Sequence, residues 1–149
     1  MGLRRYSTSH QTAAGTNLTI ACVVSTAAIK PRIFEFVIGS DATPADVATE
    51  FNLIRGTVSG TGTALTVTQP DPGDGAVVAS AEGGTFTGQT KTATSILYML
   101  ALNQRATFRF VCLPEDGFVV PATADNWIGI ESIASGGTPN INTTIMWAE

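Results

Sequence analysis

RIFEFVIG, residues 32–39, decides the fold class, because its apolar side chains recur with a period of two. Successive side chains of a β-strand point to opposite sides of the sheet. Phe34, Phe36 and Ile38 therefore share one face, and the opposite face carries Ile33, the charged Glu35 and Val37. This alternation is typical of a strand that buries one face in a core.

Similar segments recur along the chain and are separated by clusters of Gly, Pro, Asp and Asn. Within residues 18–26, the side chains predicted to share one face are Leu18, Ile20, Cys22 and Val24. The other predicted strands cover residues 49–58, 62–68, 107–113, 127–134 and 141–147. Short strands at this spacing, without a repeat, predict an all-β, single-domain jelly-roll or Greek-key β-sandwich of about eight to nine antiparallel strands.

Four segments leave more room for interpretation. Thr94–Asn103 is predicted as a buried strand, although its apolar run also fits a short helix. Residues 43–51 fit either one helical turn capped by Thr43 or a turn leading straight into a strand. SGTG, residues 59–62, is predicted as a hairpin turn. Residues 80–88 have few large side chains, so we expect an ordered loop or an edge covered by a partner.

The composition predicts one core and a surface that is partly covered. The 149 residues are 44% hydrophobic and only 13% charged, about half the charged share of a typical domain. The net charge is −4, and apart from Arg4 and Arg5 the basic residues are scattered, which argues against nucleic-acid binding. Cys22 and Cys112 lie in apolar runs and are expected to be free thiols.

No targeting signal is expected to direct this chain to a membrane. The N-terminal MGLRRYSTSH is not followed by the apolar region of a signal peptide. The longest apolar stretch, residues 96–102, is much shorter than the ~20 residues that span a bilayer. We therefore expect synthesis in the cytoplasm and no membrane partner.

Residues that carry catalytic or metal-binding chemistry are sparse. The one histidine, His10, lies in a polar N-terminal segment and is predicted to be solvated. Asp71 and Asp74, in the loop QPDPGDG, lack the spacing of a calcium loop, and no second histidine completes another metal site. We expect no enzyme activity, no catalytic or metal residues, no cofactor and no small-molecule substrate.

Three stretches together resemble a family of small structural proteins of tailed bacteriophages. They begin with PRIFEFVIGSDATPADVATEFNLIRGTVSGTGTALTV, continue with QPDPGDGAVVAS, and end with LNQRATFRFVCLPEDGFVVPATADNWIGI. The resemblance runs from about Lys30 to the C-terminus. It implies a β-sandwich virion protein, often a trimer, that sits on capsid capsomers. The expected partners are the major capsid protein and further copies of this chain, on the outer capsid surface.

The resemblance and composition together predict a decoration or cement protein that stabilises the head. Residues 1–14 are expected to form an extended arm, and residues 15–149 a single sandwich domain. Leu3, Arg4, Arg5 and Tyr6 in that arm are the candidate capsid contacts.

The alternative function is a head fibre or a tail-associated component that recognises the host. Such a role calls for exposed aromatic platforms on which sugars can stack. Trp127 and Trp147 are the only tryptophans, and we expect both to pack in a core or interface instead.

Overall fold

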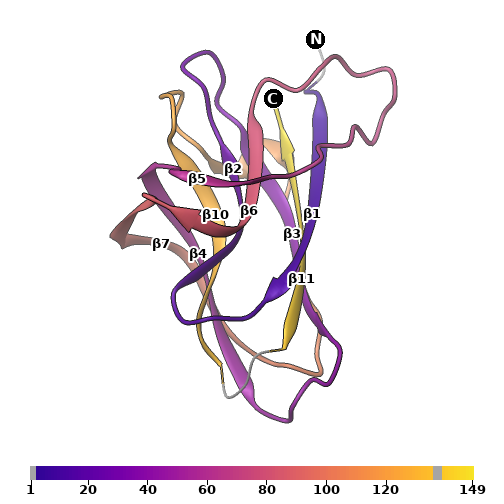
Figure 1. The fold of residues 1–149 in the computed structure, drawn as a ribbon. Coiled ribbons are helices and arrows are strands. Elements are labelled where there is room, and N and C mark those ends of the chain that lie inside the picture. The colour runs from indigo at the N-terminus through magenta and orange to yellow at the C-terminus, as the bar shows by residue number, and fades with distance from the viewer. Residues whose placement is uncertain (1–2, 136–138) are drawn as a thin grey trace.

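The computed structural model describes residues 3–135 and 139–149, which form two antiparallel sheets packed as a sandwich (Figure 1). One sheet has the order β1 (Arg5–Ala13), β11 (Asn140–Ala148), β3 (Arg32–Asp41) and β8 (Phe108–Val111), with β9 (Phe118–Val119) also paired to β3. The other has the order β5 (Thr61–Ala64), β6 (Ser80–Thr87), β2 (Leu18–Val24), β10 (Trp127–Ser135), β4 (Ala48–Val58) and β7 (Thr90–Asn103). The described residues contain one 3-10 turn, Pro114–Asp116, and no α-helix.

The all-β prediction is confirmed, and most predicted strands lie where the alternation placed them. Thr94–Asn103 belongs to a strand, β7, rather than to a helix. Residues 43–47 contain no helical turn; the chain bends there and enters β4 at Ala48. A side-chain amide helps to hold this bend, since the Ala45 N–H donates to Oε1 of Gln104 at 2.9 Å.

Two predictions about the middle of the chain are wrong. Residues 80–87 are not a loop but β6, which pairs with β2 on one side and with β5 on the other. Backbone hydrogen bonds hold this strand, and they need no large side chains. SGTG does not close a hairpin, because β5 pairs with β6 while β4 pairs with β7.

The predicted arm is mostly part of the sandwich. Arg5 to Ala13 form β1, paired with β11 from Arg5 opposite Ala148 to Ala13 opposite Asn140. Backbone bonds between Arg4 and Glu149, at 3.1 and 2.9 Å, continue the pairing to the end of the chain. The polar side chains of this segment suit an edge strand, whose outward face meets water.

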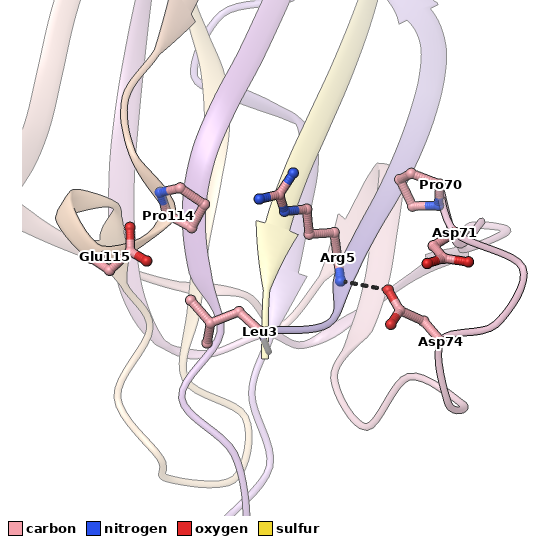
Figure 2. Close-up of a pocket in the computed structure, with 7 residues that line it drawn as sticks. All are labelled: Leu3, Arg5, Pro70, Asp71, Asp74, Pro114 and Glu115. Carbon is pink, nitrogen blue, oxygen red and sulfur yellow. Dashed lines mark hydrogen bonds between the residues drawn. The ribbon is translucent and has the colours of Figure 1, made fainter. Parts of the chain in front are cut away.

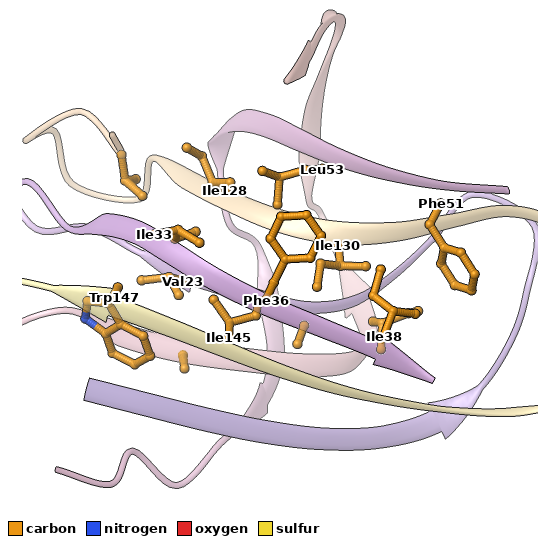
Figure 3. Close-up of a cluster of buried hydrophobic side chains, with 14 of the residues drawn as sticks. Val23, Ile33, Phe36, Ile38, Phe51, Leu53, Ile128, Ile130, Ile145 and Trp147 are labelled. Atoms are coloured by element: carbon orange, nitrogen blue, oxygen red, sulfur yellow. The ribbon is translucent and has the colours of Figure 1, made fainter. Parts of the chain in front are cut away.

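The main core lies between the two sheets and is built from aliphatic and aromatic side chains (Figure 3). Its largest fully buried members include Trp147, Tyr6, Phe36, Ile128 and Ile130. Trp127 is equally inaccessible, so the expectation that both tryptophans pack inside is confirmed. Cys22 is a buried free thiol, and Cys112 is a half-buried one.

Phe34 and Ile20 do not share a face with the other members of their predicted sets, because the strand pairing is irregular at each of them. Phe36 and Ile38 enter the core together with Ile33, because the β3–β11 register shifts between Ile33 and Glu35. Phe34 is left outside this cluster, beneath the guanidinium of Arg5 at 6.0 Å. A similar shift between β2 and β10 separates Ile20, which is in the main core, from Cys22 and Val24.

A second, smaller apolar cluster lies on the opposite face of the β2–β10–β4 sheet. It consists of Cys22, Val24, Ile54 and Trp127, with Phe86 packed against it. The indole N–H of Trp127 donates to the carbonyl of Val58 at 2.9 Å. Gly56 allows this packing, since a Cβ there would overlap the indole and the carbonyl oxygen of Thr90.

We expect Gly56→Ala to lower the free energy of unfolding by about 3 kcal/mol, because neither the buried indole nor the backbone of β7 can easily give way. Urea unfolding followed by tryptophan fluorescence measures the change. Thr57→Ala, at the exposed neighbouring position on β4, is the control and should cost less than about 1 kcal/mol. Equal effects of the two substitutions would contradict the packing of Trp127 against Gly56.

Candidate interaction surfaces

The two long sides of the sandwich are built differently, and one is closed by the chain itself. After β5 the chain crosses between the sheets: the Leu65 N–H donates to Ala81 of β6 at 2.9 Å. Three residues later Thr68 exchanges two backbone hydrogen bonds of 2.8 Å with Ser7 of β1. This segment therefore covers the gap between β1 and β6.

The loop that follows, residues 69–76, is held against the start of β1. The hydroxyl of Tyr6 donates to the carbonyl of Gly75 at 2.9 Å, and Nε2 of Gln69 donates to the same carbonyl at 2.9 Å. The Arg5 N–H donates to Oδ2 of Asp74 at 3.0 Å. The predicted surface loop is thus ordered by hydrogen bonds to β1.

A cleft of about 590 Å³ lies between this loop, the start of β1 and the 3-10 turn (Figure 2). Its lining combines acidic, basic and apolar groups: Leu3, Arg5, Pro70, Asp71, Asp74, Pro114 and Glu115. Two of the carboxylates also accept backbone hydrogen bonds, Asp71 from Gly73 at 2.8 Å and Asp74 from Arg5. The cleft can therefore contact a surface that offers apolar and basic groups.

The four candidate contact residues have different surroundings. Leu3 and Arg5 line the cleft, and the side chain of Arg4 lies close to Gly75. Tyr6 is fully buried, with its ring 5.9 Å from that of Trp147. The side chain of Tyr6 is therefore part of the core and unable to touch a capsid subunit, whereas Leu3 is exposed.

The other long side lies between the edge strands β7 and β8 and is filled by half-buried aromatic rings. Tyr98 of β7 lies 5.9 Å from Phe108 and 5.5 Å from Phe110 of β8, and Phe110 lies 5.3 Å from Phe118. Three exposed apolar side chains flank these rings. Met99 and Val111, next in sequence to Tyr98 and Phe110, point to the outer faces of their two sheets, and Leu113 lies just beyond the end of β8. We call these seven residues the edge seam.

The edge seam carries few charges. Arg109, next to Phe110 in β8, donates from Nε to Oε1 of Glu35 at 2.7 Å, and this hydrogen bond raises the pKa of Arg109. Phe110 stacks on the buried Phe36 at 5.2 Å, which ties the seam to the core. The sequence predicted these strands but not the seam. Alternation shows which side chains of a strand share a face, but not that β7 and β8 become edge strands on the same side of the sandwich.

His10 lies on β1 rather than in a free terminal segment. It is half-buried against β6, where a Cβ on Gly83 would come within 2.8 Å of its Cδ2. Burial lowers the pKa of this imidazole. Within residues 3–135 and 139–149, no group of three or more His, Cys, Asp or Glu side chains is placed to hold a metal ion.

In comparisons with known proteins, no family model, no curated protein and no solved structure matches the chain. None of the helical structure in the described residues is long and apolar enough to cross a membrane.

We expect Tyr6→Phe to lower the free energy of unfolding by about 1 kcal/mol, because it removes the hydrogen bond to Gly75 and keeps the ring in the core. Amide hydrogen exchange should accelerate in residues 69–76 before it changes elsewhere. Tyr98→Phe is the matched control, since the Tyr98 hydroxyl has no hydrogen bond among the described residues. Unchanged exchange in the loop would show that Tyr6 does not hold it.

Proposed function

We propose that this chain is a structural protein of a tailed-bacteriophage particle, which binds the outer capsid surface as a decoration protein and stabilises the head. The resemblance of three long stretches to phage structural proteins suggests the particle. The observation that carries the proposal is the edge seam, a half-exposed row of aromatic rings bordered by exposed aliphatic side chains. Its apolar surface suits assembly with other protein subunits.

The proposal includes a jelly-roll topology. One sheet has the order β1-β11-β3-β8, and the facing sheet contains the order β2-β10-β4-β7. When β5, β6 and β9 are left out, the chain alternates between the two four-strand sets except from β4 to β7, which are consecutive and pair with each other in the second sheet. Such an arrangement follows when a long antiparallel ribbon, with β1 beside β11 and β2 beside β10, wraps around a common core.

The proposed assembly is a homotrimer in which each copy buries its edge seam. A seam on one side of the sandwich meets two others when three copies surround a common axis. Burial of apolar surface yields roughly 25 cal/mol per Å², so a row of half-exposed rings favours association strongly. The low charged share of 13% agrees with a surface that is covered in the particle.

Met99→Glu combined with Val111→Glu should convert the trimer to a monomer, because each introduced carboxylate would lose its hydration inside an apolar contact. Size-exclusion chromatography with light scattering gives the mass of each species. The control is Val78→Lys, at an exposed valine whose N–H donates to Glu149 at the other side of the sandwich. A monomeric parent protein at high concentration would refute the trimer.

The capsid-binding surface is proposed to be the cleft lined by Leu3 and Arg5. Because β1 is part of the sandwich, deleting the N-terminal segment would destroy the fold and test nothing about binding. Point substitutions in the cleft avoid this problem, since the side chain of Leu3 is exposed.

Quantitative mass spectrometry of purified particles, together with a cryo-EM map, tests the location. We expect hundreds of copies of the parent protein on the outer shell. Leu3→Asp should lower this occupancy at least tenfold. Arg105→Ala, at an exposed position far along the chain, is the control and should leave the occupancy unchanged. A few copies at one vertex or on the tail would favour the head-fibre or host-recognition alternative. Absence from particles would exclude a virion role.

A further inference from the structure

Three polar side chains from neighbouring strands converge on the face of the β4–β10 sheet that points away from the main core. Nζ of Lys91, on β7, contacts Oε1 of Glu131, on β10, and the backbone carbonyl of Asn17. Glu131 is directly opposite Asn52 in the register of β10 with β4. All four residues line one cavity of about 360 Å³.

The surroundings of this cluster are mostly apolar. Ile54, Ile96 and Ile133 complete the lining of the cavity. The side chain of Glu131 is 5% exposed and that of Lys91 26%. Water therefore has little access to the carboxylate of Glu131, and the Lys91 side chain reaches that carboxylate from the edge of the cavity.

Asn52 is a buried polar residue whose side-chain oxygen is not satisfied by a hydrogen bond within the described part of the chain. It is 4% exposed, and its Oδ1 has no hydrogen-bond partner among the described residues. Side chains directly opposite each other on adjacent strands have Cβ atoms about 5 Å apart. The amide of Asn52 and the amine of Lys91 therefore both lie beside the one carboxylate of Glu131.

We propose that Lys91 and Asn52 form an intramolecular isopeptide bond, with Glu131 as the proton-transfer group. Glu131 accepts a proton from the Lys91 ammonium, and the neutral Nζ adds to Cγ of Asn52. The protonated carboxyl then donates to Oδ1, takes a second proton from Nζ and passes it to Nδ2. As the tetrahedral carbon collapses to the new amide, the proton on Oδ1 leaves with the departing nitrogen. The new Nζ–Cγ bond forms and the Cγ–Nδ2 bond breaks.

The reaction is balanced without an oxidant or a second reactant. Nζ enters as an ammonium group with three protons and keeps one in the product amide. Its other two protons leave with the Nδ2 amino group as an ammonium ion, and Glu131 ends as the carboxylate with which it began. The protein loses one ammonia in mass.

The cross-link would join two strands where their backbone pairing is interrupted. Between the pairs Ile54–Ile96 and Gly56–Lys91, β7 has four intervening residues while β4 has one. Hydrogen bonds of the ladder cannot continue through such a bulge. A covalent bond from Lys91 to Asn52 would anchor β7 on β4 at this point, whether or not the chain belongs to a virion.

Intact mass spectrometry of the purified full-length chain provides the test. We expect a mass about 17 Da below the value calculated from the sequence, and a tryptic fragment that joins the peptides of Asn52 and Lys91. Lys91→Arg and Asn52→Ala should each restore the full mass and lower the melting temperature by roughly 10 °C, as expected for opening a closed loop of this length.

Two further variants separate the bond from other losses of ammonia. Lys30→Arg, at the only other lysine, should keep the deficit, and Glu131→Gln should restore the full mass while both reacting residues remain. A full mass in the parent protein would overturn the proposal without any variant. A deficit that persists in Lys91→Arg would also overturn it, since that result assigns the loss to cyclisation of an asparagine alone.

Discussion

The pairing of β1 with β11 is the contact on which the other features depend. It joins the two ends of the described chain and places the ring of Tyr6 against Trp147 in the core. The same strand then offers Ser7 and Tyr6 to the segment that closes one side of the sandwich. Because this pairing links residues far apart in sequence, its loop-closure entropy must be overcome before the contacts form, which predicts slow folding.

One consequence is an asymmetric molecule. The side next to β1 is covered by residues 65–76, whose backbone and side chains bond to β1 and β6. Within the part of the chain that the structure describes, the opposite side has no such cover, so the rings of Tyr98, Phe108 and Phe110 fill the space between β7 and β8 and remain half-exposed. This difference in how the two sides are completed is the physical basis for the proposed assembly through the edge seam.

A second consequence concerns the face of the β4–β10 sheet that points away from the core. On this face Phe86 of β6 packs against Trp127, Cys22 and their neighbours. The contact between Lys91 and Glu131 lies on the same face, where an ion pair gains less from attraction than it loses in hydration unless further bonds compensate. The presence of this polar cluster on an otherwise apolar face agrees with the proposed reaction between Lys91 and Asn52.

The sequence by itself determined the all-β class and most strand positions, because alternation such as that of Phe36 and Ile38 reflects a local rule of side-chain direction. It did not reveal that residues 80–87 form a strand, since their pairing relies on backbone bonds. The bulge that leaves Phe34 outside the main core cluster was equally hidden. Only the tertiary structure decided that Leu3 and Arg5 meet the loop at residue 71, and that Lys91 reaches Glu131, because both depend on which distant strands become neighbours.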